Sequence, residues 1–113
     1  MGYSVDYDAS RHRIVARFRD RLDAQDGVDS AQQLMDVLGE DPIDVIFDVS
    51  EMDGYDGAAR QAWQRALWPA RKQLRSITLV GGSAVARLGG KLLAAALGIR
   101  MRQAASLREA LGS

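Results

Sequence analysis

Residues 43–49, Ile-Asp-Val-Ile-Phe-Asp-Val, are the stretch that decides the fold. Val45, Ile46 and Phe47 form a continuous run of apolar residues that favour β-structure, which is typical of a strand covered on both faces. The polar and acidic segment Ser50–Asp56 follows, and we expect it to be a loop. The sequence therefore predicts a central strand of a sheet with a loop at its carboxyl end.

An amphipathic helix is predicted on the N-terminal side of this strand, at about Asp29–Leu38. Its apolar residues recur at helical spacing, and Asp29 or Ser30 is the expected N-cap. Gly39 is expected to end it, because glycine is favoured just past the last turn of a helix.

A second helix is predicted to start near Gly57, on the C-terminal side of the central strand. Pro69 lacks a backbone N–H and clashes with the preceding turn, so we expect a break or kink after Leu67. Trp68 lies off the face that carries Trp63, and we expect it to be exposed.

The remaining segments predict a β-hairpin at the N-terminus and two further strands with helices at the C-terminus. The strands are expected at Tyr3–Tyr7, His12–Phe18, Ser76–Val80 and Ile99–Ala104. The third helix, Ala84–Leu97, is expected to bury Val85, Leu88, Leu92 and Leu97, with Leu93 and Ala96 beside them. It is closed by Gly98, and a short terminal helix opens at the capping box of residues 106–109.

This order predicts a single α/β domain over residues 1–113. Strands separated by helices are most simply joined by right-handed crossovers, which give a parallel sheet. We therefore expect a mixed sheet of four to five strands, with an N-terminal antiparallel hairpin, parallel central strands and about four helices.

The composition excludes several kinds of functional site. The 113 residues include no cysteine, which excludes disulfides, thiolate metal sites and cysteine nucleophiles. The longest apolar stretch, Leu92–Leu97, is far shorter than the roughly 20 residues of a membrane span. We expect a cytoplasmic protein with no membrane span.

The formal net charge of zero hides a division along the chain. Residues 1–56 hold 14 acidic and 5 basic side chains, for a net charge of −9, whereas residues 57–113 carry a net charge of +9. Such an asymmetry can mark a basic surface for phosphates, nucleic acid or an anionic membrane. We expect instead that the two halves interleave in space, so that their fields cancel.

Four stretches together resemble the STAS domain family, and most closely its divergent bacterial SpoIIAA-like or STAS/SEC14-like branch. They span about residues 12–111. The stretches are Arg-Asp-Arg-Leu-Asp-Ala at 19–24, Val-Ile-Phe-Asp-Val-Ser at 45–50, Ile-Thr-Leu-Val-Gly-Gly-Ser at 77–83 with Leu-Gly-Ile at 97–99, and Ala-Ser-Leu-Arg-Glu-Ala-Leu at 105–111. The resemblance implies a SpoIIAA-like fold and a non-enzymatic protein–protein interaction module of regulatory type. Family precedent supplies anti-sigma factors and switch kinases as partners.

The sequence departs from this family at the phosphorylation motif. The family's Asp-Ser-Ser-Gly-like loop falls on residues 56–59, Asp-Gly-Ala-Ala, so that Asp56 is kept and both serine positions lack a hydroxyl. A phosphoserine switch works by adding about two negative charges to such a hydroxyl. That switch cannot operate at Gly57 or Ala58.

Two groups of residues are candidate binding sites. The expected partner-binding residues surround the predicted loop and the second helix: Asp48, Glu51, Asp53, Asp56, Gly57, Ala58, Arg60 and Trp68. The turn Gly81-Gly82-Ser83 precedes a helix and is a candidate anion-binding site, although a plain strand–helix turn is the simpler interpretation. We predict no catalytic residues, no metal site and no cofactor.

Other partners stay open at this point. The basic residues Arg60, Arg65, Arg71, Lys72 and Arg75 could contact nucleic acid or lipid headgroups, but a solvated helix face is the simpler interpretation and we expect no nucleic-acid partner. The only histidine, His12, is expected in a turn. A homodimer is one option, and a small-ligand, lipid or nucleotide-binding domain is the alternative function.

Overall fold

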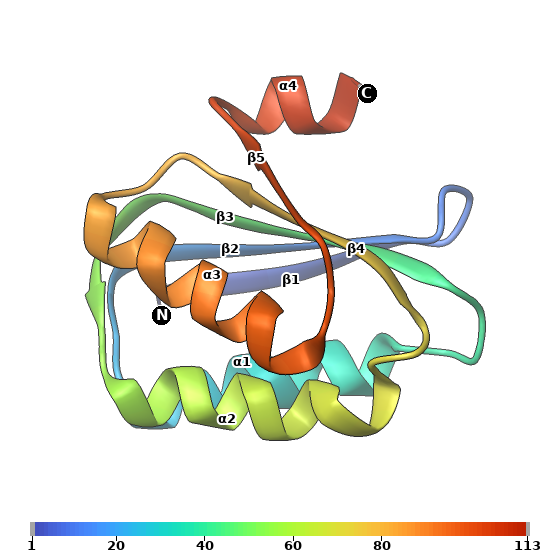
Figure 1. Cartoon of the computed structure of the whole chain (residues 1–113), viewed down its shortest axis with the longest axis horizontal. Helices are drawn as coiled ribbons and strands as arrows, with labels where there is room; N and C mark the ends of the chain where they lie inside the picture. The colour runs from blue at the N-terminus through green and yellow to red at the C-terminus, as the bar shows by residue number, and fades with distance from the viewer. Residues whose placement is uncertain (1, 113) are drawn as a thin grey trace.

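The central strand of the sheet is β3 (Ile43–Tyr55), as expected. The structure is a computed structural model that describes residues 2–112 (Figure 1). Its other elements are β1 (Tyr3–Asp8), β2 (Arg13–Leu22), α1 (Ala24–Val37), α2 (Gly57–Leu67), the 3₁₀ helix η1 (Trp68–Ala70), β4 (Leu74–Val80), α3 (Ala84–Leu97), β5 (Met101–Ala104) and α4 (Leu107–Gly112). The strand order is β1-β2-β3-β4-β5, so each strand lies beside its neighbour in the sequence.

The predicted fold class is confirmed. β1 and β2 form an antiparallel hairpin, and the pairs β2–β3, β3–β4 and β4–β5 are parallel. Helices α1, α2 and α3 cover one face of the sheet, and α4 lies on the other face (Figure 1). No helix within residues 2–112 is both long and apolar enough to cross a membrane.

Three aromatic rings meet where α2 packs on the sheet. The Phe18 and Phe47 rings stack with centroids 6.1 Å apart, and the edge of Trp63 meets them at 5.9 and 5.0 Å. The Trp63 Nε1–H donates to the Ser30 hydroxyl at 3.1 Å, which satisfies a buried polar group. These contacts tie β2, β3, α1 and α2 together.

Helix α1 starts earlier than predicted, and the predicted caps Asp29 and Ser30 are wrong. The N-cap is Asp23, whose side chain accepts from the Asp26 N–H at 2.8 Å. Ser30 is fully buried inside the helix. The first turns carry little apolar periodicity because α1 crosses α2 at Gly27, where a Cβ atom would lie 2.5 Å from the Ala59 Cα.

The predicted loop Ser50–Asp56 is also wrong, since β3 continues to Tyr55. Its extension pairs with a longer β2 than predicted, which runs on past Phe18 to Leu22. The register shifts twice along this extension, and Asp20 takes a φ of 55° there. These bulges and the polar outward side chains conceal the strand periodicity in the sequence.

The buried face of α3 differs from the prediction. Leu97 is buried as expected, but Val85, Leu88 and Leu92 are 59%, 55% and 44% exposed. The face against the sheet combines Leu93 and Leu97 with the small residues Ala86, Gly89 and Ala94. A small residue is needed at Gly89, because a Cβ there would lie 2.6 Å from the Tyr55 ring. Periodicity alone could not distinguish the two apolar faces of this helix.

Several helix boundaries are confirmed. Helix α2 ends at Leu67 and the chain continues as η1, with Pro69 inside it. The Ser83 hydroxyl caps α3 by accepting from the Ala86 N–H at 3.2 Å, and Gly98 ends α3 with a φ of 69°. β5 is an edge strand, as expected.

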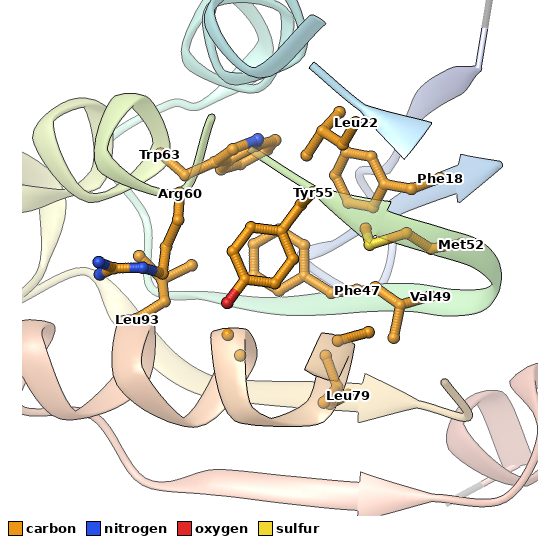
Figure 2. A pocket seen from close by; sticks show the side chains of 13 residues that line it. Phe18, Leu22, Phe47, Val49, Met52, Tyr55, Arg60, Trp63, Leu79 and Leu93 are labelled. Atoms are coloured by element: carbon orange, nitrogen blue, oxygen red, sulfur yellow. The ribbon is translucent and has the colours of Figure 1, made fainter. Parts of the chain in front are cut away.

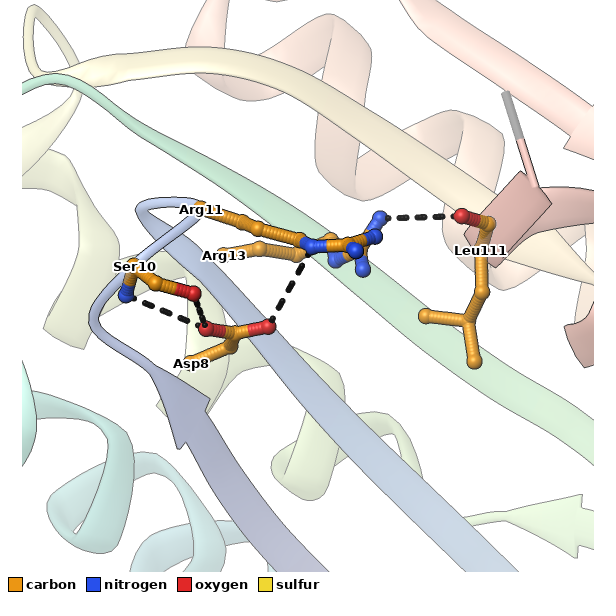
Figure 3. Close-up of polar contacts among 5 residues, drawn as sticks. All are labelled: Asp8, Ser10, Arg11, Arg13 and Leu111. Carbon is orange, nitrogen blue, oxygen red and sulfur yellow. Dashed lines mark hydrogen bonds and ion pairs between the residues drawn. The ribbon is translucent and has the colours of Figure 1, made fainter.

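The hairpin turn is fixed by polar contacts and lies near α4 (Figure 3). The Asp8 carboxylate accepts from the Ser10 hydroxyl at 2.7 Å and from the Ser10 N–H at 3.1 Å, and the hydroxyl bond is the main cause of the lowered pKa of Asp8. Arg13 donates from Nη1 to the Leu111 carbonyl at 3.4 Å, which connects the start of β2 to α4. His12 lies in the turn, as predicted, with a φ of 50°, and its side chain is half-buried.

The close crossing of α1 and α2 leads to a stability prediction. Gly27→Ala should lower the free energy of unfolding by about 2 kcal/mol, since overpacking against Ala59 outweighs a gain of about 1 kcal/mol in helix propensity. Gly57→Ala is the matched control because nothing lies within 4 Å of its Cβ position. Urea unfolding followed by circular dichroism measures both, and equal stability of Gly27→Ala and the parent chain would contradict the close crossing.

Candidate functional site

Most acidic residues in and just after β3 are paired with arginines. Three ion pairs join β2 to β3 and to the residue that follows it: Arg17–Asp48 at 3.6 Å, Arg19–Glu51 at 3.4 Å and Arg21–Asp56 at 2.6 Å. No cluster of three or more His, Cys, Asp or Glu side chains suited to a metal ion occurs within residues 2–112. We call these three pairs the β2–β3 charge ladder.

Asp48 is the buried member of the ladder. Its carboxylate accepts from the Ser50 hydroxyl at 2.6 Å and from the Ser50 N–H at 3.1 Å, in addition to the Arg17 contact. A buried carboxylate needs such partners, because an unpaired buried charge is costly. Asp48 therefore has a structural role that explains its presence without any ligand.

Asp56 occupies the N-cap position of α2, but its side chain makes no capping bond. It accepts instead from Arg21, at 2.6 Å from Nη2 and 3.1 Å from Nε. Gly57 and Ala58 follow on the exposed first turn of the helix, and Asp53 is exposed on β3.

The turn between β4 and α3 lies against β3, beside Asp48 and Ser50. A Cβ atom at Gly81 would lie 2.8 Å from the Ser50 Cβ, and Gly81 and Gly82 take φ values of 63° and 95° that glycine tolerates. The Ser83 hydroxyl is used as the cap of α3. The structure thus gives these residues a turn and capping role, and anion binding there stays a prediction.

A small apolar cavity, which was not predicted from the sequence, lies between α2, α3 and the sheet (Figure 2). Its volume is about 60 Å³, and Arg60 is its only charged lining residue. The Tyr55 hydroxyl points toward α3 (Figure 2). The one sequence signal for this close packing is the pair Gly89-Gly90 inside a helix, where glycine is otherwise unfavourable.

Trp68 is 49% exposed, as predicted, and Arg71 holds its ring in place. The Arg71 guanidinium lies 3.9 Å from the ring centroid, and its Nη1 donates to the Trp68 carbonyl at 2.7 Å. Ala58, Gln61, Arg65 and Trp68 are all exposed and recur at helical spacing along the outside of α2. We call these four residues the α2 ridge.

The structure does not bring the predicted partner-binding residues into one site. Asp48, Glu51 and Asp56 belong to the charge ladder, whereas Trp68 follows the opposite end of α2. Arg60 is half-buried beside the cavity, and its Nη1 donates to Gln64 at 3.4 Å. These residues were expected to form one site because residues 50–56, which extend β3, have the polar composition of a loop.

The expectation that the acidic and basic halves interleave stays a prediction. Acidic α1 packs on β1 and β2 and beside α2 of the basic half, whereas α3 packs on β3 and β4. Burial is the largest cause of the raised pKa of Tyr3 in β1, and the nearby carboxylates of Asp29 and Asp26 add to it.

Two solved structures have a fold similar to that of this chain. An uncharacterised DUF3478-family protein from Shewanella loihica PV-4, described as having a SpoIIAA-like fold, superposes with a TM-score of 0.71 over 97% of this chain and 89% of that chain, at 14% sequence identity. This chain has the SpoIIAA-like fold. The unphosphorylated anti-sigma factor antagonist SpoIIAA is also similar, with a TM-score of 0.54 over 97% of this chain and 94% of that chain, at 14% identity.

The SpoIIAA-like resemblance inferred from the four sequence stretches is thus confirmed at the level of the fold. No family model matches the sequence, and no curated protein matches it significantly. The likeness therefore resides in the arrangement of strands and helices.

The charge ladder predicts unequal effects of two otherwise similar substitutions. Arg17→Met should lower the free energy of unfolding by about 1–2 kcal/mol, because it leaves the buried Asp48 carboxylate without its cation. Arg19→Met should cost under about 0.5 kcal/mol, since both side chains of that pair are mostly exposed. Chemical denaturation measures the difference, and equal costs would show that Asp48 does not depend on Arg17.

Proposed function

We propose that this domain is a non-enzymatic protein-interaction module of regulatory type, and that it binds its partner through the α2 ridge. The single observation that carries the proposal is Trp68, a half-exposed tryptophan on a polar helix surface. Tryptophan is enriched among the few residues that dominate binding energy in protein interfaces. Pro69 and the contact with Arg71 hold the Trp68 side chain in one orientation. The side chain therefore loses less conformational entropy when a partner binds.

The charge around Trp68 points to an acidic partner. Arg65 belongs to the same ridge, and Arg71 and Lys72 follow within one turn, while residues 57–108 contain no Asp or Glu. Complementary charge raises the association rate and disfavours basic partners. The expected partner surface therefore combines an apolar pocket for the indole ring with surrounding carboxylates.

The fold supports a regulatory role by precedent, because SpoIIAA is an anti-sigma factor antagonist. A fold alone does not fix a function, so the proposal rests on the α2 ridge. Gly57 and Ala58 offer no hydroxyl at the start of α2, so we propose that binding is not controlled by serine phosphorylation at that point. A cytoplasmic location belongs to the same proposal.

A second candidate function is the binding of a small ligand in the cavity beneath α3. Ligand pockets usually enclose about 300–1,000 Å³. At about 60 Å³ the cavity holds neither a lipid nor a nucleotide unless α3 moves away from the sheet. A thermal-shift screen against both ligand classes distinguishes this candidate, because a ligand that binds the folded state raises Tm.

The α2 ridge predicts the effect of one substitution on partner binding. Trp68→Ala should weaken binding by about 30-fold or more, which corresponds to the loss of about 2 kcal/mol expected at a dominant interface residue. A partner is first captured with the parent domain from its own cells, then purified, and its Kd for each variant is measured by titration calorimetry.

Val37→Ala is the matched control for this measurement, because Val37 is an exposed apolar residue on α1 outside the ridge. It should leave the Kd unchanged. An unchanged Kd for Trp68→Ala, with the fold intact by circular dichroism, would show that the α2 ridge is not the binding surface.

A further inference from the structure

The outer face of α3 exposes three large apolar side chains that the fold does not need there. Val85, Leu88 and Leu92 lie at positions i, i+3 and i+7, so they form one stripe along the helix. Scattered apolar residues are normal on a protein surface, but a continuous stripe of this kind marks a contact site. Their spacing is that of the anchor residues of a helix that docks into a groove.

Cations accompany this stripe. Arg87 and Lys91 are exposed on the same helix, and α3 contains no carboxylate. A surface that receives α3 must therefore offer apolar contacts together with negative charge.

The same chain carries such a surface elsewhere, in a groove between α1 and α2. The groove encloses about 310 Å³ and is lined by Ala24, Val28, Ala31, Gln32, Ala58, Ala62, Arg65 and Ala66. Val28 is 52% exposed at its α1 side. The small alanine side chains leave room for larger apolar side chains from outside.

Negative charge borders this groove on its α1 side, whereas Arg65 places one cation on its α2 side. Helix α1 carries three aspartates and has no Lys or Arg along its length, and Asp36 is the one bonded to a groove residue. Asp36 is exposed, and Gln32 at the groove donates to its carboxylate at 2.8 Å. The acidic edge of one molecule thus complements the basic α3 of another, and the net charge of zero leaves no overall repulsion between copies.

We propose that the chain self-associates head to tail, with α3 of one copy docked in the α1–α2 groove of the next. Leu88 and Leu92 enter the groove beside Val28, and Arg87 and Lys91 face the carboxylates of α1. Because the stripe and the groove are different surfaces of one chain, the contact is heterologous and adds further copies as concentration rises.

The contact is expected to be weak. A 14-residue helix is about 21 Å long, so laying it in a groove buries less than the roughly 1,600 Å² of a standard interface. Association should therefore depend on concentration, and added sodium chloride should weaken it by screening the charge pairs.

Sedimentation velocity of the purified full chain over a concentration series tests the proposal. The parent chain should shift from monomer to larger species, whereas Leu88→Ser with Leu92→Ser should stay monomeric. Val28→Lys with Gln32→Lys, which places cations in the groove, should also stay monomeric. All four positions are exposed, so these variants should fold, and Val37→Ser is the matched control that should associate like the parent.

Mixing the two monomeric variants is the decisive step. Each retains the surface that the other has lost, so the mixture should form a 1:1 complex and grow no further. Failure of the mixture to associate would overturn the head-to-tail contact, as would a parent chain that remains monomeric at all concentrations. A monomeric parent that binds phosphatidylserine vesicles through Leu88 would overturn it in favour of a membrane surface.

The groove overlaps the α2 ridge at Ala58 and Arg65, and Trp68 is the residue that separates this inference from the proposed function. Trp68 does not line the groove, so Trp68→Ala should associate like the parent chain. If Trp68→Ala loses partner binding but still self-associates, partner binding and self-association use different contacts.

Discussion

The structure depends on the contact between Trp63 and the two phenylalanines of the central strands. Phe18 and Phe47 place two rings side by side on the helix-covered face of the sheet, and the indole of Trp63 meets both rings edge-on. Its N–H needs a partner in this apolar setting, and Ser30 of α1 supplies it. One side chain of α2 thereby fixes the positions of two helices and two strands.

Close approach of the helices follows from this arrangement. Ser30 can reach Trp63 only because α1 and α2 cross with Gly27 against Ala59. The same requirement removed large apolar residues from the first turns of α1, which is why its start could not be predicted from periodicity. Helix α2 was predictable, because its buried face carries Trp63 and Leu67 at regular spacing and Pro69 marks its end.

The strands and the overall order were predictable because each carries β-favouring residues between recognisable turns. The extension of β3 was not, since its exposed carboxylates hide the alternation with buried Met52. This error also affected the candidate site. Glu51 and Asp56 were predicted to lie in a loop available to a partner, but they pair with arginines of β2. The face of α3 depends on where Gly89 meets Tyr55, which is a tertiary contact with no local signature.

The order of strands in the sheet has a consequence for how the chain is made. Every strand pairs with the strand that precedes it in the sequence, so no strand has to insert between two that are already paired. During synthesis from the N-terminus, each new strand emerges beside a neighbour that already exists. The hairpin of β1 and β2 can therefore serve as the template on which the parallel strands are added one at a time, and β5 joins last, at the edge.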